Sequence, residues 1–214
     1  MATADATIVE KAIHSWLMPI ASVAPVPHRL ALGFLLRDND AEIRRDGWGR
    51  LWDPEEAARY AVVRDAVERF AGQDGEVLDV GCAQGVLQCG LRYGQYTGID
   101  LAPETIARAA DRADAHTRFL VADAATYTPG RTYDAIVFNE CLYYLRDPVG
   151  VAQRYVRHLA PGGVIVVSMF DRAWALRRIL RRLEAVGPVV AGARVINRTG
   201  AAWTVQVHQP GGQA

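Results

Sequence analysis

The sequence lacks most of the features that place a protein in a specialised structural class. It has three cysteines, Cys82, Cys89 and Cys141, an odd number without metal-ligand spacing, so we expect reduced thiols and no metal site. Its 24 basic and 24 acidic side chains cancel, which leaves no net charge to attract nucleic acid or an acidic membrane. No apolar run has the length of a membrane span, and the first residues lack the basic flank and apolar core of a signal peptide. These absences predict a cytoplasmic protein that acts on small molecules.

The chain does have the length and apolar content of an ordinary enzyme domain. Its 214 residues, half of them hydrophobic, are enough for the core of a single domain over residues 1–214. We expect a helical cap over residues 1–70 and a ligand-binding core over 71–209. The oligomeric state is open at this stage, and a homodimer is one option. Arginine outnumbers lysine 23 to one, which is typical of a GC-rich bacterial genome and says nothing about the substrate.

The most informative stretch is residues 76–85, EVLDVGCAQG, which predicts a short buried strand that runs into a glycine turn. Gly81 and Gly85 let backbone N–H groups approach a ligand where a Cβ atom would collide. We expect a helix to start directly after the turn and to add a favourable dipole. The next glycine is Gly90, so the spacing G-x-G-x-x-G of dinucleotide enzymes is not met, which weakens an NAD interpretation. The turn therefore favours another nucleotide-cofactor loop, with ordinary backbone angles at Ala83 because alanine does not adopt positive φ cheaply.

Three further segments each end in a polar side chain where an adenosine ligand needs one. The strands are expected over residues 96–100, 117–124 and 133–140. Asp100 ends the first of them, about 20 residues after the glycine loop, where a carboxylate can accept hydrogen bonds from both ribose hydroxyls. Asp123 ends the next and is placed to accept from an adenine amino group. Asn139 and Glu140 end the last, at the carboxyl edge where open α/β sheets bind ligands.

In order and spacing these segments resemble the first four motifs of the class I S-adenosylmethionine-dependent methyltransferases, with Ala83 in place of the middle glycine of the family's loop. The resemblance continues through residues 159–167, LAPGGVIVV, where Pro-Gly-Gly followed by a β-branched run is typical of the family's fifth strand. Residues 195–208 predict a closing antiparallel hairpin. The resemblance spans roughly residues 55–208. It implies a doubly wound, Rossmann-like α/β fold: a seven-stranded, mostly parallel sheet with an antiparallel C-terminal hairpin and an N-terminal helical cap.

The cofactor of that family is S-adenosylmethionine, and the resemblance assigns a set of residues to it. These are Asp79, Gly81, Cys82, Ala83, Gly85, Asp100, Leu101, Asp123, Ala124, Asn139, Glu140 and Arg59. Arg59 lies on a helix expected to start with Asp53 as a capping acid and Pro54 in its first turn. Its expected partner is the carboxylate of the cofactor, and the alternative is an ordinary surface arginine. Asp79 also has an alternative, because an acid there can simply hold backbone N–H groups of the loop.

Methyl transfer from a sulfonium requires mainly that the acceptor is held in line with the methyl group. A neutral amine attacks without a base, whereas an alcohol or phenol gains from a positioned proton acceptor. The catalytic candidates are Glu140, His28 and Tyr143, although His28 has the alternative of a solvated loop residue. The substrate-binding candidates are Trp48, Trp52, Tyr60 and Tyr144. Core packing is the alternative for these aromatic side chains, most of which lie in the cap that builds the acceptor pocket in relatives.

The predicted function is methyl transfer to nitrogen or oxygen of a small-molecule acceptor. Residues 139–145, NECLYYL, resemble the fourth motif of bacterial methyltransferases that modify sugars and secondary metabolites, whereas base-modifying enzymes place Asn/Asp-Pro-Pro-aromatic there. Two alternatives stay open, a non-catalytic relative with a binding or regulatory role and an NAD-dependent oxidoreductase. An arginine-rich helix near residues 172–183 is expected to present a solvated outer face, with anion binding as its alternative.

Overall fold

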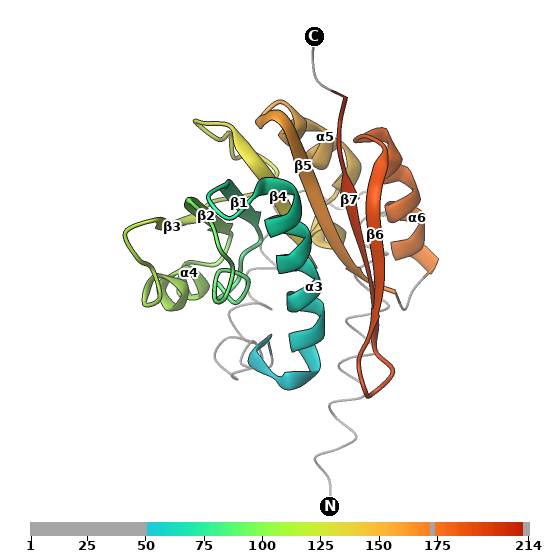
Figure 1. Cartoon of the computed structure of the whole chain (residues 1–214), viewed down its shortest axis with the longest axis horizontal. Coiled ribbons are helices and arrows are strands. Elements are labelled where there is room, and N and C mark those ends of the chain that lie inside the picture. Colours follow the sequence, from blue (N-terminus) through green and yellow to red (C-terminus); the bar gives the residue numbers. More distant parts are fainter. Residues whose placement is uncertain (1–50, 172–173, 212–214) are drawn as a thin grey trace, which may run out of the picture.

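The computed structural model describes residues 51–171 and 174–211 (Figure 1). Two of the predicted site residues, His28 and Trp48, lie outside the described residues. The same is true of most of the cap expected over residues 1–70.

The described residues form one seven-stranded sheet with the strand order β3-β2-β1-β4-β5-β7-β6. The strands are β1 Glu76–Val80, β2 Gln95–Asp100, β3 Thr117–Val121, β4 Tyr133–Asn139, β5 Leu159–Phe170, β6 Val189–Ile196 and β7 Ala202–His208. The first five pair in parallel, and β7 runs antiparallel to both of its neighbours, β5 and β6. The predicted parallel sheet with an antiparallel closing hairpin is therefore confirmed.

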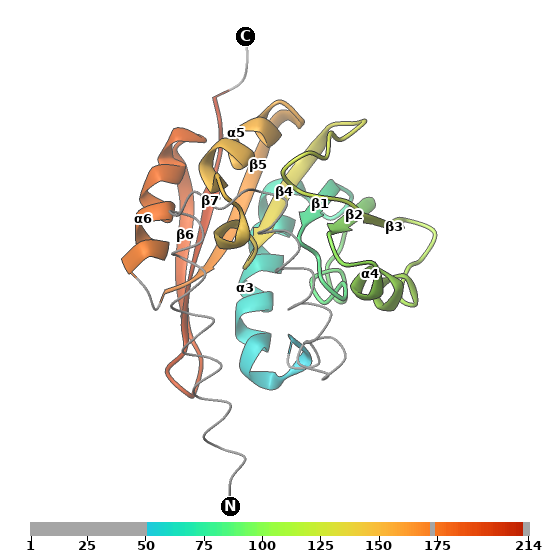
Figure 2. The ribbon, with the colours of Figure 1, turned by 180° about the vertical axis from the view of Figure 1, so that it is seen from behind.

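Helices cover both faces of this sheet. They are α3 Pro54–Ala71, α4 Pro103–Ala110, α5 Pro148–Val156 and α6 Trp174–Arg182, with short 3₁₀ turns η2 Leu142–Tyr144 and η3 Leu183–Ala185. Helix α3 crosses one face, and α5 and α6 lie on the opposite face (Figures 1 and 2). Val63 of α3 belongs to the apolar cluster on the first face, and Tyr155 of α5 belongs to the cluster on the second. The doubly wound arrangement is thus confirmed.

Strand β5 shows why its sequence is a continuous apolar run. Val164 and Val166 pack into the cluster under α3, whereas Ile165 and Val167 pack into the cluster under α5 and α6. Successive side chains of a strand point to opposite faces, so a strand covered on both faces needs apolar residues at every position. Ser168 follows these valines and is the first polar side chain in the run.

Two expectations about helix starts were wrong. Helix α3 begins at Pro54 as predicted, but the Asp53 side chain makes no capping hydrogen bond. The Asp53 carbonyl instead accepts from the Glu56 backbone N–H at 2.9 Å. No helix follows the glycine loop either, because residues 81–90 form turns. Four residues in this segment have positive φ, which a right-handed helix does not allow.

The outer face of α6 is solvated, as predicted. Its exposed arginines are Arg177, Arg178, Arg181 and Arg182, whereas Leu180 and the following Leu183 are buried. Arg177 also pairs with Asp171 at 3.5 Å.

None of the described helices combines the length and apolarity needed to cross a lipid bilayer.

Candidate cofactor and acceptor site

The carboxyl ends of the parallel strands meet at a switch point between β1 and β4. From β1 the chain continues to β2 on one side, whereas β4 and β5 extend the sheet on the other side. Ligands of open α/β sheets bind in the crevice outside such a point. The segments after β1, β2 and β4 place Gly81, Asp100 and Glu140 at this edge, so the structure brings together residues that the sequence predicted as one site.

Asp100 ties the glycine loop to the start of α4. Its Oδ2 atom accepts from the backbone N–H of Ala83 at 3.0 Å, and its Oδ1 atom accepts from that of Ala102 at 3.0 Å. Each carboxylate oxygen has a second lone pair, so both can still accept from ribose hydroxyls. The prediction of ordinary backbone angles at Ala83 was wrong, since its φ is 47°. The bond to Asp100 helps to hold Ala83 in this conformation, which alanine alone disfavours.

Two glycines allow the loop to pack tightly against the rest of the sheet edge. Gly81 has φ of 74°, and a Cβ atom added to it would lie 2.5 Å from the Cβ atom of Cys141. Gly85 has φ of 75°, and a Cβ atom there would lie 2.8 Å from Cζ of Phe119. Both positions therefore need glycine for conformation and for space.

Asp79 lies under the glycine loop and is 1% exposed. Its Oδ2 atom accepts from the Tyr96 hydroxyl at 2.6 Å. Its Oδ1 atom is buried and has no hydrogen-bond partner among the described residues. Burial raises the pKa of Asp79 to about 7, although the Tyr96 hydrogen bond and the nearby Arg59 charge counter this shift. An unpaired buried acceptor fits a ligand that brings N–H groups or positive charge to the loop.

The raised pKa of Asp79 leads to a prediction about stability. Between the ordinary pKa of 3.8 and about 7, the folded chain keeps a proton that the unfolded chain releases, so the Asp79 contribution to the free energy of unfolding falls as pH rises. We expect Asp79→Asn to show a smaller fall than the wild type between about pH 4 and pH 7 in chemical denaturation. Asp111→Asn, at an exposed position, is the matched control. Parallel pH curves for wild type and Asp79→Asn would contradict the prediction.

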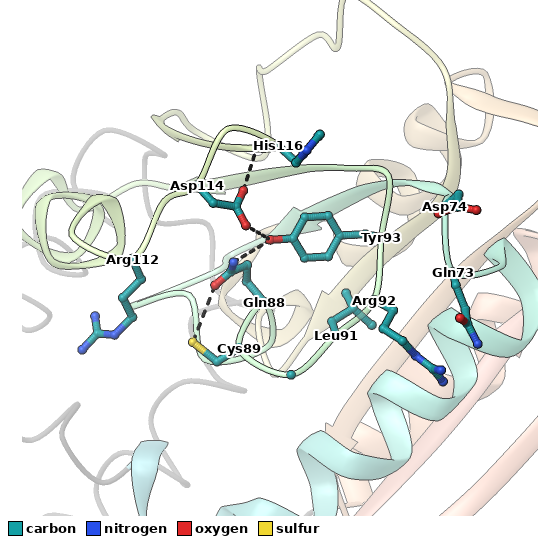
Figure 3. Close-up of a pocket in the computed structure, with 11 residues that line it drawn as sticks. Gln73, Asp74, Gln88, Cys89, Leu91, Arg92, Tyr93, Arg112, Asp114 and His116 are labelled. Atoms are coloured by element: carbon teal, nitrogen blue, oxygen red, sulfur yellow. Dashed lines mark hydrogen bonds between the residues drawn. The ribbon is translucent and has the colours of Figure 1, made fainter.

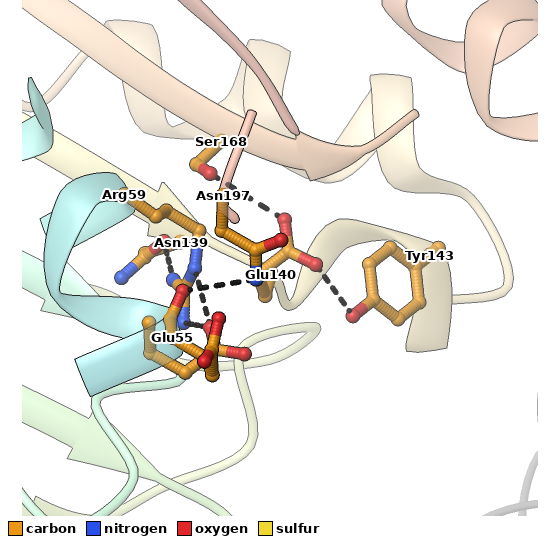
Figure 4. A network of polar contacts seen from close by, with 8 residues as sticks. Glu55, Arg59, Asn139, Glu140, Tyr143, Ser168 and Asn197 are labelled. Carbon is orange, nitrogen blue, oxygen red and sulfur yellow. Dashed lines mark hydrogen bonds and ion pairs between the residues drawn. The ribbon is translucent and has the colours of Figure 1, made fainter. Parts of the chain in front are cut away.

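Arg59 is buried, with 1% exposure, and is not the surface arginine of the alternative interpretation. Its Nε and Nη2 atoms donate to Oε2 of Glu56 at 3.1 and 2.8 Å, and its Nη1 atom donates to Oδ1 of Asn139 (Figure 4). The guanidinium lies over the Tyr60 ring at 4.3 Å and faces the Trp203 ring at 5.8 Å. Burial lowers the pKa of Arg59, but Tyr60, nearby Glu140 and Glu56 raise it overall, so the group stays charged.

Glu140 follows β4 with φ of 62°, a conformation that non-glycine residues rarely adopt. Its Oε2 atom accepts from the Tyr143 hydroxyl at 3.1 Å, and its Oε1 atom accepts from the Ser168 hydroxyl at 3.4 Å (Figure 4). Burial raises the pKa of Glu140 to about 7, while the Arg59 charge and these hydrogen bonds counter the shift. The site therefore holds a carboxyl group in a fixed orientation that changes charge near neutral pH.

The remaining cofactor candidates lie along the same edge. Asp123 follows β3, and its Oδ1 atom accepts from the backbone N–H of Ala125 at 2.8 Å. The Ala124 carbonyl accepts from the Tyr155 hydroxyl at 3.1 Å. Cys82 is buried, and burial raises the pKa of its thiol, so it is not poised as a nucleophile. Leu101 follows Asp100 and is partly buried.

The aromatic candidates occupy three different places. Trp52 is 41% exposed, and its indole N–H donates to Oε1 of Gln84 in the glycine loop at 3.2 Å. Tyr60 is 6% exposed and packs in the apolar cluster of α3 beneath Arg59. The Tyr144 ring lies against the Tyr143 ring, with centroids 4.6 Å apart. Trp52 and Tyr144 thus flank the ligand edge, whereas Tyr60 supports Arg59.

Some residues of this network were missed by sequence reasoning. Glu56 and Ser168 contact predicted site residues but carried no assigned role. Ser168 had a signal, because a lone hydroxyl at the end of an apolar strand is unusual, and it pairs in register with Asn139. Asn197, in the turn between β6 and β7, donates to the carbonyl of Glu55 at 3.2 Å and had no comparable signal.

A separate hollow of about 650 Å³ lies at the opposite end of the strands (Figure 3). Its lining includes Asp74 before β1, Tyr93 before β2 and Asp114 before β3. The Tyr93 hydroxyl donates to Asp114 at 3.2 Å and shares a hydrogen bond of 2.8 Å with Thr117. Tyr93, Asp114 and Thr117 thus satisfy one another, and none of the predicted site residues that the structure describes lines the hollow. It lies away from the edge where ligands of such sheets bind.

Comparison with known proteins agrees with this geometry. Residues 55–208 match the methyltransferase domain family. The chain belongs to the class I S-adenosylmethionine-dependent methyltransferases. The trans-aconitate 2-methyltransferase of Methylobacterium radiotolerans is 34% identical over 151 residues, which are 65% of this chain and 58% of the relative. A ubiquinone biosynthesis O-methyltransferase of Psychrobacter cryohalolentis is 31% identical over 134 residues, which are 56% of this chain and 51% of the relative. The chain therefore spans between half and three fifths of the length of these two methyltransferases.

Solved structures confirm the methyltransferase fold. The N-methyltransferase NodS from Bradyrhizobium japonicum, in complex with S-adenosylhomocysteine, has a TM-score of 0.67 and 23% identity, and the match covers 77% of this chain and 92% of that one. The 1,6-didemethyltoxoflavin-N1-methyltransferase from Burkholderia thailandensis, also with S-adenosylhomocysteine, has a TM-score of 0.69 and 20% identity, with coverage of 88% and 93%. The predicted family, fold and cofactor are thus confirmed, and the NAD interpretation has no support from the family.

Proposed function

We propose that this protein transfers a methyl group from S-adenosylmethionine to nitrogen or oxygen of a small-molecule acceptor, as a tailoring step on a bacterial sugar or secondary metabolite in the cytoplasm. The observation that carries the proposal is the convergence of Asp100, buried Arg59 and the oriented Glu140 carboxyl at one strand edge. Support for a small acceptor also comes from neighbours, among them the sugar N-methyltransferase KedS8 from Streptoalloteichus, with a TM-score of 0.53 and 21% identity over 78% of each chain.

The residues at the edge suit each part of the cofactor. Arg59 has five N–H donors, and among the described residues three of them donate to Glu56 and Asn139; the others are proposed to bind the methionine carboxylate. The unpaired Asp79 oxygen suits the methionine ammonium group. Asp100 would accept from the ribose and Asp123 from the adenine amino group. When bound, the cofactor supplies a methyl group on a positively charged sulfur.

Glu140 is proposed to take the proton of the acceptor. Tyr143 and Ser168 hold its two oxygens, so the carboxylate keeps one orientation towards the edge. A base with a pKa of about 7 is half deprotonated at neutral pH and suits ammonium groups or acidic hydroxyls such as phenols. An aliphatic alcohol holds its proton too tightly for such a base. Amines and phenols are therefore the acceptors to screen first, with Trp52 and Tyr144 as proposed contacts.

The proposal is tested by calorimetric titration with S-adenosylmethionine, S-adenosylhomocysteine and NAD under one set of conditions. We expect binding of the first two alone. We further expect Asp100→Ala to weaken binding by about 1.5–3 kcal/mol, the range for a hydrogen bond to a charged group, with exposed Asp111→Ala as control. Unchanged affinity in Asp100→Ala would remove the ribose assignment. Cofactor binding without turnover of any amine or phenol would instead favour a regulatory relative.

A further inference from the structure

We propose that the β6–β7 hairpin positions Arg59, with Asn197 as the positioning residue. The inference rests on the proposed function, in which Arg59 binds the carboxylate of the cofactor. According to this inference, the β6–β7 hairpin contributes to cofactor affinity although it lies far from the cofactor motifs in the sequence.

The first observation is a contact with the helix turn that carries Arg59. The Asn197 Nδ2 atom donates to the Glu55 carbonyl at 3.2 Å (Figure 4). In an α-helix the carbonyl of residue i accepts from the N–H of residue i+4, and Arg59 stands four residues after Glu55 within α3. Asn197 therefore binds the same carbonyl to which the Arg59 backbone is tied.

The second observation is that the amide of Asn197 has only one usable orientation. Its Oδ1 atom accepts from the Thr199 backbone N–H at 3.0 Å, from the Thr199 hydroxyl at 2.8 Å and from the Ala201 backbone N–H at 2.9 Å. These donors fix the oxygen on the side of the turn, so the NH₂ group must face α3. The same side chain therefore builds the turn and holds the helix.

The third observation is that the hairpin also contacts the head group of Arg59. Trp203 of β7 faces the guanidinium at 5.8 Å and is itself packed against Phe170, with ring centroids 5.6 Å apart. Arg198 pairs with the Glu55 side chain, but its own side chain is 83% exposed, and such pairs contribute little. Asn197 and Trp203 thus hold the two ends of Arg59, and the solvated Arg198 pair provides an internal control.

The position of α3 matters because Arg59 must reach two elements at once. Its guanidinium donates to Glu56 on its own helix and to Asn139 at the end of β4. The Asp53 side chain provides no cap at the start of this helix. A small displacement of the first turn would move the guanidinium away from Asn139 and from a ligand carboxylate. The adenosine part of a ligand does not contact Arg59 in this proposal, so its binding would not change with this displacement.

The test compares two ligands in calorimetric titration, S-adenosylhomocysteine and 5′-methylthioadenosine, which shares the adenosine and sulfur but lacks the carboxylate. Asn197→Asp keeps the oxygen that builds the turn and removes the N–H donor to Glu55. We expect it to weaken S-adenosylhomocysteine binding by about 3- to 10-fold, the range for one hydrogen bond. Binding of 5′-methylthioadenosine should stay at the wild-type value, which also reports a folded chain. Arg198→Ala should bind both ligands as the wild type does.

The effect must act through Arg59, so it should vanish when Arg59 is absent. In an Arg59→Ala background, Asn197→Asp should cause no further loss of S-adenosylhomocysteine affinity. Wild-type affinity in Asn197→Asp, or an equal loss for both ligands, would overturn the role of the hairpin while the cofactor assignment stands. A wild-type protein that binds S-adenosylhomocysteine no more tightly than 5′-methylthioadenosine would overturn the Arg59 assignment and this inference together.

Discussion

Replacing Glu140 with glutamine is expected to lower kcat by about 10²- to 10⁴-fold, the usual contribution of a positioned general base. Glutamine keeps the size of the side chain and can still accept from Tyr143 or Ser168, the two groups that hold Glu140. It cannot take up a proton. Affinity for S-adenosylhomocysteine should change far less than kcat, because the loss concerns the acceptor. The measurement is steady-state kinetics with an amine or phenol acceptor found in the screen.

The pH dependence of kcat/KM provides a second test of Glu140 as the base. Burial raises the pKa of Glu140 to about 7, and only the deprotonated form can act as a base. The kcat/KM of the wild type should therefore rise with pH and level off above about 7. In Glu140→Gln that rise should disappear.

Two variants separate Glu140 from other titrating groups. Asp79, whose pKa burial also raises to about 7, should not control the rise, so Asp79→Asn should keep it. The Tyr143 hydrogen bond lowers the pKa of Glu140. Tyr143→Phe should therefore shift the rise to higher pH. A profile that is the same in wild type and Glu140→Gln would rule out Glu140 as the base.

Replacing Gly81 with alanine is expected to destabilise the fold and to weaken cofactor binding together. A residue other than glycine in the left-handed region costs about 1–2 kcal/mol, and Gly81 has φ of 74°. The new methyl group would also lie 2.5 Å from the Cβ atom of Cys141, and overpacking of this kind costs about 1–3 kcal/mol more. The loop and the segment after β4 would have to separate, which would pull the loop away from Asp100.

Gly162 offers a control for the conformational part of this cost. It has φ of 81°, and a Cβ atom added to it would meet nothing within 4 Å. Chemical denaturation should therefore show a loss of about 1–2 kcal/mol in Gly162→Ala and a clearly larger loss in Gly81→Ala. Adding Cys141→Gly to Gly81→Ala should recover part of the difference. If the two substitutions lowered the free energy of unfolding equally, the close packing of Gly81 against Cys141 would not contribute to stability.

Much of the fold could be predicted because its signals are local. Each central strand is a short apolar run that ends at glycine or an acid, and such runs are typical of strands buried on both faces. Asp100 was predicted for the same reason, since a carboxylate directly after a parallel strand lies at the ligand edge whatever the rest of the chain does. Helix α3 was located by Pro54, whose fixed φ suits the first turn of a helix.

The errors came from contacts that local patterns do not contain. Ala83 was expected to avoid positive φ, yet the Asp100 carboxylate binds its N–H from another strand. The helix expected after the loop did not form, because the glycine positions that bring the backbone close to the sheet edge carry positive φ. Asp53 was expected to cap α3, but the structure shows no such hydrogen bond.

The sequence by itself determined the family, the mostly parallel sheet with its antiparallel closing hairpin and the acids at the strand ends, because these depend on short segments and their succession along the chain. Only the tertiary structure decided that Arg59 is buried against Asn139, 80 residues away, and that Asn197 holds the start of α3 from 142 residues away. It also decided that Glu140 lies between Tyr143 and Ser168. Such contacts depend on how the helices and the closing hairpin pack on the sheet. The same packing excludes solvent, and this desolvation raises the pKa of Glu140 above its ordinary value.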